Sequence, residues 1–284
     1  MNRGFKKFLH GLAFPFVAFS LGLKFSSAKR KYKKYKADPN SLSIEKRYGY
    51  IYKLVKRVVF LHNVEVYASG IKNCPKVPAL YIINHKSMLD GLLIYKLLWE
   101  NGDIPYFRII AKGELEETKT SSAMHLIDSI LINRQNIRDT AKLFAEEIKP
   151  SIDKKSLVVF PEGTRIYDPE VFGEFHPGSF RIALDNYLPI VPVVIYGTSG
   201  VGIRENKQYL NKNKQIFISF LPPIKANQFM TTHSVRVAEE IKNEMFKEYK
   251  RIDAIVKAQP NKLVKDPHLV FEDIDNEKKS EKRK

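Results

Sequence analysis

Residues 79–90 read Ala-Leu-Tyr-Ile-Ile-Asn-His-Lys-Ser-Met-Leu-Asp, and they give the strongest indication of the fold class. The first five are apolar without interruption, which is typical of a strand buried on both faces. Ser87 is followed three residues later by Asp90, the spacing of a capping box that begins a helix. The apolar residues of 91–99 continue that helix. A buried strand that leads directly into a helix is typical of an α/β fold.

The chain on either side alternates in the same way. Short apolar runs predict strands, and longer stretches with apolar residues three and four apart predict helices. The predicted strands are 79–83, 107–111, 129–132, 156–160, 190–195 and 215–220. The predicted helices are 43–59, 91–99, 138–148 and 234–256. This alternation predicts an α/β fold with a mixed, mostly buried sheet flanked by helices.

Composition divides the chain into three predicted segments. Residues 1–36 are basic and apolar, and the turn signal Asp-Pro-Asn-Ser at 38–41 closes this segment. Residues 37–258 carry the α/β pattern and form one predicted domain. Residues 259–284 are polar and charged, which predicts a disordered tail.

The first segment carries most of the charge. Of a net charge of +17, ten Lys or Arg lie within residues 1–36, where there is no Asp or Glu. Such a cluster binds a polyanion, which is either nucleic acid or the anionic face of a membrane. Residues 8–23 between the charges hold four Phe and four Leu, which a hydrocarbon interface explains and a nucleic-acid arm does not. We therefore predict a helical module that docks on an anionic bilayer surface, and no nucleic-acid partner.

How the first segment meets the membrane stays open among three alternatives. The uncharged run 8–23 is shorter than the ~20 residues a spanning helix needs, and it contains Pro15, so an interfacial or re-entrant anchor is favoured over a spanning helix. A cleaved signal peptide is the least favoured, because the basic block 29–36 is of a kind that stays on the cytoplasmic side. The single cysteine, Cys74, also fits a reducing compartment. The expected location is the cytoplasmic face of the cell membrane.

The first candidate for chemistry is the pair His85 and Asp90. His85 lies just before the predicted helix and Asp90 lies in its first turn, so the two side chains can meet across the junction. A carboxylate on one ring nitrogen stabilises the imidazolium and leaves the other nitrogen free to accept a proton. The pair is therefore a candidate general base. Ser87 fits a helix cap better than an acyl acceptor, and backbone amides near the helix start are candidates for holding an oxyanion.

The second candidate is the run Phe-Pro-Glu-Gly-Thr-Arg at 160–165, which also ends a predicted strand. Gly163 lets backbone amides approach a ligand closely. Arg165 offers a planar fork that matches phosphate oxygens, and Glu162 is a candidate for binding a hydroxyl or holding Arg165. A surface Glu–Arg pair with no ligand explains the same residues about as well. The spacing of these acidic and histidine residues does not predict a metal site.

Four blocks of this sequence, taken together, resemble those of the glycerolipid acyltransferase family. They are Asn-His-x-Ser-x-x-Asp at 84–90, Ile-Asn-Arg at 132–134, Phe-Pro-Glu-Gly-Thr-Arg at 160–165 and Leu-Pro-Ile-Val-Pro-Val at 188–193. The resemblance runs from about residue 77 to residue 196 and is nearest to the branch that acylates 1-acylglycerol-3-phosphate. The six-residue match at 160–165 and the order of all four blocks make it specific.

The resemblance implies roles for particular residues. It implies that His85 is the base and that Asp90 is its partner. It assigns substrate binding to six residues, which are Glu162, Gly163, Thr164, Arg165, Arg134 and Lys112. The chain departs from the family at His176, where a Lys is common, and at 116–122, which is more polar than usual.

The reaction implied is transfer of a fatty acyl group from a thioester to the sn-2 hydroxyl of 1-acylglycerol-3-phosphate, which gives phosphatidic acid. The co-substrate is acyl-CoA or acyl carrier protein, and no further cofactor is expected. Glycerol-3-phosphate or another lysophospholipid is the alternative acceptor. A non-catalytic membrane adaptor and a basic nucleic-acid-binding protein are the alternatives from other classes.

Overall fold

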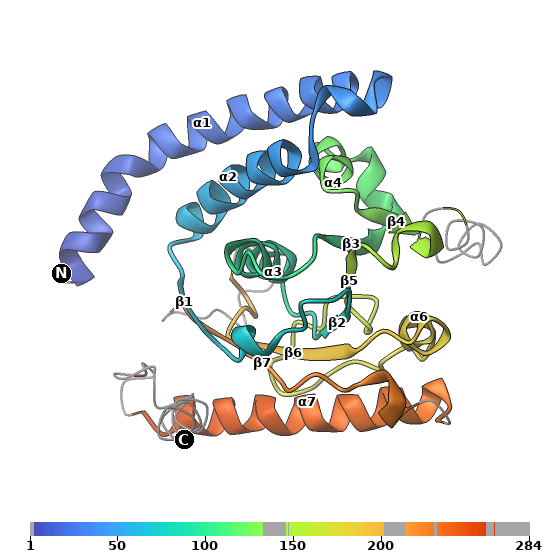
Figure 1. The fold of residues 1–284 in the computed structure, drawn as a ribbon. Coiled ribbons are helices and arrows are strands. Elements are labelled where there is room, and N and C mark those ends of the chain that lie inside the picture. The colour runs from blue at the N-terminus through green and yellow to red at the C-terminus, as the bar shows by residue number, and fades with distance from the viewer. Residues whose placement is uncertain are drawn as a thin grey trace, which may run out of the picture. The chain divides into compact units, whose positions relative to one another are not determined.

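The computed structural model describes residues 3–132, 146, 148–201, 214–229, 232–259 and 264 (Figure 1). The chain forms two compact units, each made of discontinuous segments. The first unit comprises residues 1–63, 91–100 and 106–157, and the second comprises residues 64–90, 101–105 and 158–284. The predicted segment boundaries after residues 36 and 258 fall close to the ends of two long helices, and they stay predictions.

The first unit holds most of its described residues in helices. These are α1 (Arg3–Ala37), α2 (Ile44–His62), the greater part of α3 (Leu89–Glu100) and α4 (Ser121–Leu126), with short 3₁₀ helices at Pro39–Ser41, Gly113–Glu117 and Lys149–Ser151. The parallel strands β3 (Phe107–Lys112) and β4 (Ile130–Ile132) complete it. α1 packs against α2 and α4. The hydroxyl of Ser43 begins α2 by accepting the Lys46 N–H.

The second unit contains a mixed sheet. Its strands are β1 (Glu65–Ser69), β2 (Leu80–Ile83), β6 (Ile190–Tyr196) and β7 (Gln215–Phe220), in the order β1-β7-β6-β2. β1 runs parallel to β7 and β2 parallel to β6, whereas β6 and β7 are antiparallel. β5 (Ser156–Val159) begins in the first unit and ends in the second.

Two helices flank the second unit's sheet, and α7 carries the clearest pattern. α6 (Gly178–Asn186) and α7 (Ser234–Lys257) pack against each other, and α7 also lies on β6 (Figure 1). The buried residues of α7 recur three and four apart, as a helix with one apolar face requires. They include Val237, Ile241, Met245, Tyr249 and Ile252. Short 3₁₀ helices at Ile71–Asn73 and Ala226–Gln228 complete the unit.

The structure confirms the predicted fold class, a mixed α/β sheet flanked by helices. Every predicted strand is present, with ends that differ by one residue at most. β1, α4 and α6 were not predicted, because β1 is short and half-exposed and the two helices are nine residues or fewer. The predicted helix 138–148 lies almost entirely outside the described residues, as does the tail after Gln259.

Candidate active site

The imidazole of His85 is held by Asp90 at the junction of β2 and α3. His85 Nδ1 lies 2.9 Å from Asp90 Oδ2, and the same oxygen accepts the backbone N–H groups of Lys86 and Ser87, each at 2.7 Å. The Asp90 side chain is fully buried, whereas 20% of the His85 side chain is exposed. A carboxylate at Nδ1 favours the tautomer in which Nδ1 carries the proton. Nε2 is then the nitrogen that accepts a proton.

The start of α3 explains why this carboxylate tolerates burial. An ionised carboxylate away from water needs several hydrogen bonds, and here two backbone N–H groups and the imidazole supply them to one oxygen. Asp90 also lies in the first turn of α3, where the helix dipole favours negative charge. The local sequence therefore provides both the buried carboxylate and the groups that bond its Oδ2, whereas Oδ1 has no hydrogen-bond partner among the described residues.

Ser87 serves the helix start, as the spacing predicted. α3 begins at Leu89, whose N–H donates to Ser87 Oγ at 3.3 Å, and the Ser87 N–H returns a bond to Asp90. The Ser87 hydroxyl also donates to the Val201 carbonyl at 3.0 Å, and the side chain is buried. A buried hydroxyl with two partners is poorly placed to accept an acyl group.

Four of the backbone amides at this junction, where an oxyanion site is predicted, are already engaged, and the site stays a prediction. The backbone N–H of His85 donates to Glu162, and those of Lys86 and Ser87 donate to Asp90. The N–H of Leu89 donates to the Ser87 hydroxyl. These four amides are already satisfied, so holding an oxyanion with any of them requires breaking a bond that shapes the site.

The Glu162 carboxylate is hydrogen-bonded to the backbone of His85. Glu162 Oε1 accepts the His85 backbone N–H at 3.1 Å, and Oε2 accepts the Gly173 N–H at 3.2 Å. The Ile166 N–H donates to the His85 carbonyl at 2.8 Å, so both backbone polar groups of His85 are bonded to residues 162–166. Burial raises the pKa of the Glu162 carboxyl, although these hydrogen bonds and the nearby Lys86 charge oppose the rise. Glu162 is therefore a support for the base, which its predicted role as a substrate ligand did not include.

The turn after Glu162 depends on two glycines. Gly163 has φ +68°, a left-handed conformation that favours glycine, and its N–H closes the turn on the Phe160 carbonyl. A Cβ on Gly173 would lie 2.9 Å from a side-chain carbon of Ile166 and 3.1 Å from Glu162 Oε2. The Phe160 ring also contacts the His85 imidazole, with centroids 4.3 Å apart. The match at 160–165 thus has a local structural reason beside the implied substrate contacts.

The remaining predicted substrate-binding residues have different settings. Thr164 is exposed, and Arg165 is half-buried with its guanidinium 5.6 Å from the centre of the Tyr167 ring. Lys112 is exposed at the end of β3 and belongs to the first unit. Arg134 lies outside the described residues. The predicted grouping of these three basic residues in one phosphate pocket stays a prediction.

Lys86 is an important residue that the sequence reasoning missed. Its side chain is fully buried, and its ammonium donates to the carbonyls of Asp168, at 2.7 Å, and Val171. The ammonium also faces the rings of Phe172 and Tyr249, at 5.2 Å and 5.5 Å. Burial lowers the pKa of Lys86 to about 8, although the neighbouring carboxylates oppose the shift. Lys86 therefore anchors the segment that carries Gly173 to the segment that carries the base.

The described residues contain no cluster of three or more His, Cys, Asp or Glu side chains placed to hold a metal ion.

Comparison with known proteins gives the family of the chain. A family model described as Acyltransferase matches residues 64–196, which include His85, Asp90 and the run 160–165. A probable 1-acyl-sn-glycerol-3-phosphate acyltransferase of Mycoplasma pneumoniae is 32% identical over 224 residues, which are 76% of this chain and 83% of that protein. The chain belongs to the acyltransferase family. A Mycoplasma genitalium protein with the same description is 32% identical over 232 residues, 78% of this acyltransferase and 85% of that protein.

A solved structure supports the fold of the acyltransferase. It is the crystal structure of the 1-acyl-sn-glycerophosphate (LPA) acyltransferase PlsC from Thermotoga maritima, which superposes with a TM-score of 0.60. The match covers 88% of this chain and 98% of that chain at 22% sequence identity. At this identity the likeness concerns the fold alone.

The buried lysine predicts how stability depends on pH. The pKa of Lys86 is about 8 in the folded protein and 10.5 ordinarily, so between these values the unfolded chain binds more protons at this residue. Stability therefore rises with pH in this window. We expect the free energy of unfolding of the wild type to gain about 2 kcal/mol relative to Lys86→Met between pH 8 and pH 10, measured by urea unfolding.

The control for this measurement is Lys247→Met, which removes an exposed lysine of α7. Its curve of stability against pH should run parallel to that of the wild type. Parallel curves for wild type and Lys86→Met would contradict the lowered pKa.

Proposed function

We propose that the protein transfers a fatty acyl group from an acyl thioester to the sn-2 hydroxyl of 1-acylglycerol-3-phosphate and so forms phosphatidic acid. The observation that carries the proposal is the partly exposed His85 imidazole with Nδ1 bonded to a fully buried carboxylate. Relatives described as acting on this acceptor add support. The same base would also serve glycerol-3-phosphate or another lysophospholipid, which is the alternative acceptor.

The proposed reaction is a direct attack without an acyl-enzyme. Nε2 of His85 takes the hydroxyl proton as the acceptor oxygen forms a bond to the thioester carbonyl carbon. Asp90 stabilises the imidazolium. When the tetrahedral intermediate collapses, the carbon–sulfur bond breaks and the departing thiolate receives the proton from His85. An acyl thioester is already activated, so no nucleophilic side chain is needed, which agrees with the engaged hydroxyl of Ser87.

Acceptor binding is proposed to use the phosphate. Arg165 has the fork that pairs with phosphate oxygens, and Thr164 is exposed beside it. Arg134 and Lys112 are proposed as further phosphate contacts. Fixing the phosphate orients the acceptor hydroxyl toward Nε2. The thioester donor is proposed to be acyl-CoA or an acyl carrier protein, since both are anionic and the chain has a net charge of +17.

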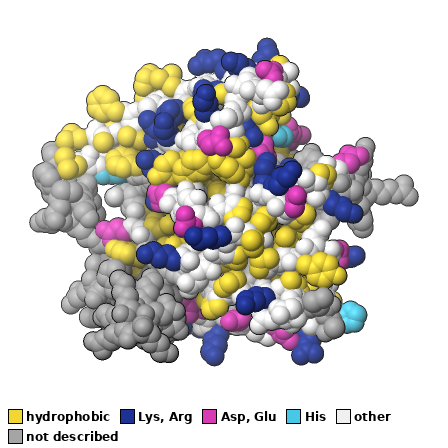
Figure 2. Space-filling view, viewed as in Figure 1, with side chains coloured by type: hydrophobic (Ala, Val, Ile, Leu, Met, Phe, Trp, Pro, Cys, Tyr) yellow, Lys and Arg dark blue, Asp and Glu magenta, His cyan; other side chains and the backbone are white. Residues whose placement is uncertain are grey.

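The helix α1 offers a surface for membrane docking. It contains a stretch, Leu9–Ala37, long and apolar enough to cross a membrane, and only 6% of its most apolar window is buried. Leu9, Leu12, Phe16, Phe19 and Leu23 are 41–77% exposed and recur three and four apart, which places them on one face. Figure 2 shows hydrophobic side chains standing out along α1 at the upper left.

We propose that this face of α1 enters the acyl region of the bilayer and that the protein docks on the cytoplasmic face of the cell membrane. The basic residues 29–36 would then meet anionic headgroups. Docking by α1 brings the enzyme to an acceptor and an acyl chain that both reside in the membrane.

Replacing the proposed base gives the first test of the reaction. His85→Ala should lower turnover by about 10²–10⁴, the usual size of a general-base contribution. The assay measures label transferred from acyl-CoA to each acceptor offered separately: lysophosphatidic acid gives labelled phosphatidic acid, and glycerol-3-phosphate gives labelled lysophosphatidic acid. Near-normal turnover in His85→Ala would remove the assignment of the base.

The matched control is His233→Ala, because His233 is exposed and lies outside residues 84–90 and 160–165. It should keep full activity. Label that appears only with glycerol-3-phosphate would overturn the proposed acceptor and leave the base intact.

Docking by α1 predicts the effect of two substitutions that add charge to its apolar face. Phe16→Asp with Phe19→Asp puts two carboxylates into the exposed apolar face, and each charge disfavours insertion by about 2–3 kcal/mol. The double variant should no longer float with liposomes in a flotation assay. The control pair, Tyr187→Asp with Val235→Asp, changes residues outside α1 that are 63% and 54% exposed, against 77% and 71% for Phe16 and Phe19, and it should still float. Equal flotation of both pairs would show that α1 is not the docking surface.

A further inference from the structure

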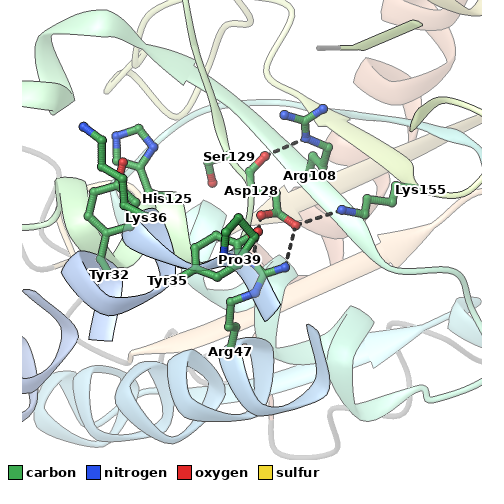
Figure 3. A pocket seen from close by; sticks show the side chains of 10 residues that line it. All are labelled: Tyr32, Tyr35, Lys36, Pro39, Arg47, Arg108, His125, Asp128, Ser129 and Lys155. Atoms are coloured by element: carbon green, nitrogen blue, oxygen red, sulfur yellow. Dashed lines mark hydrogen bonds and ion pairs between the residues drawn. The ribbon is translucent and has the colours of Figure 1, made fainter. Parts of the chain in front are cut away.

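The first unit contains a polar cavity that no part of the proposed reaction uses. Its volume is about 380 Å³, within the range of about 300–1,000 Å³ typical of small-molecule sites. Tyr32, Tyr35 and Lys36 reach it from the last turns of α1 (Figure 3). The wall is completed by Pro39 and by side chains from α2, β3, α4, the turn between α4 and β4, and the segment before β5. The cavity is therefore assembled by the end of the helix that carries the apolar face.

The wall of this cavity carries excess positive charge. Four cationic side chains line it against one carboxylate, that of Asp128; they are Lys36, Arg47, Arg108 and Lys155. Asp128 accepts from Arg47 at 2.7 Å and from Lys155 at 2.8 Å. Burial raises the pKa of the Asp128 carboxyl, but these two hydrogen bonds outweigh it and hold the pKa below its ordinary value. A single ionised carboxylate thus neutralises only part of the wall.

Two buried polar atoms of the wall residues have no partner in the part of the chain that the structure describes. Arg47 Nε and the hydroxyl of Ser129 are buried and have no hydrogen-bond partner among the described residues. Both residues are at least nine-tenths buried, with 5% and 6% of their surface exposed. Buried polar groups are rarely left unpaired, so these two atoms show that the described residues do not fully satisfy the polar groups of the wall. An oxyanion supplies several acceptors at once.

The rest of the wall is already held in place for a ligand. The Arg47 guanidinium lies over the Tyr35 ring, 4.2 Å from its centroid, and Arg108 Nε donates to the Asp128 carbonyl at 2.6 Å. The Tyr32 ring stacks on His125 at 4.7 Å, and His125 is bonded in turn to Glu116. Asp128 itself has φ +52°, a conformation that Asp tolerates better than most residues. Such prior ordering lowers the entropy lost on binding.

We propose that this cavity binds the phosphate group of an anionic membrane phospholipid. Guanidinium and ammonium groups are the usual partners of a tetrahedral phosphate group. A lipid source is favoured over free phosphate because three wall residues belong to α1, the same helix that exposes Phe16 and Phe19. The lipid assignment rests on the proposed docking by α1, whereas phosphate binding itself does not.

A matched pair of double variants tests the cavity. Lys36→Gln with Lys155→Gln removes two charges from the wall, and Lys34→Gln with Lys154→Gln removes two charges from adjacent residues that do not line it. Partition of the full chain is measured on phosphatidylcholine vesicles with and without phosphatidylglycerol. The control variant should lose only general electrostatic attraction, so its partition should fall by at most about fivefold per lysine. Phosphatidylglycerol should increase the partition of the wild type, and the wall variant should lose at least about tenfold more of this increase than the control does.

Soluble probes separate the two sources of phosphate and guard against misfolding. Calorimetric titration with dihexanoyl-phosphatidylglycerol should show binding that the single variant Lys36→Gln weakens; Lys36 is exposed, so its loss should leave the fold intact. Inorganic phosphate should bind more weakly, and dihexanoyl-phosphatidylcholine should not compete. Equal losses in the two double variants, or titrations unaffected by Lys36→Gln, would overturn the site. Inorganic phosphate that binds as tightly as the lipid would overturn the lipid assignment.

None of these readouts depends on acyl transfer. A protein that binds the anionic lipid through this wall but transfers no acyl group would contradict the proposed function and leave the cavity assignment in place. A protein that transfers acyl groups but does not bind the lipid through this wall would support the proposed function and contradict the cavity assignment.

Discussion

One carboxylate oxygen organises this acyltransferase. Asp90 Oδ2 accepts the His85 imidazole and two backbone N–H groups at the start of α3, so the strand end, the helix start and the base share one acceptor. A buried carboxylate with a single partner would be costly, and the backbone bonds are what permit its burial. Because β2 is itself wholly buried, the imidazole projects from the end of a rigid strand, and its Nδ1 is engaged by Asp90.

Residues 162–166 hold the backbone of His85 in place. Glu162 holds the backbone N–H of His85, and Ile166 holds its carbonyl. Lys86 ties the segment 168–172 to the same junction by donating to two of its carbonyls. Two stretches about eighty residues apart in sequence are thereby bonded to each other around the base. The block at 160–165 therefore combines an exposed side, proposed for phosphate binding, with a buried side that fixes His85.

The sequence predicted the strands because their apolar runs are continuous, and it predicted the His85–Asp90 pair because local helix geometry determines that contact. It did not predict that both oxygens of Glu162 would be occupied by backbone donors, since this depends on a tertiary contact with β2 and on the close approach at Gly173. It missed Lys86 for a related reason: lysine is ordinarily exposed, and only the fold encloses this one with two carbonyls and two rings. The helix start and Glu162 engage four of the amides near the predicted oxyanion site, a use that local sequence does not reveal.

The central claim is that Asp90 places the proton of the neutral imidazole on Nδ1 and leaves Nε2 to accept the acceptor's proton. Nitrogen-15 NMR of the histidine-labelled protein measures this directly, and the signals missing from the His85→Ala spectrum identify the residue. We predict a protonated Nδ1 and an unprotonated Nε2, with this preference lost in Asp90→Asn. A neutral His85 that carries its proton on Nε2 in the wild type would contradict its assignment as the general base.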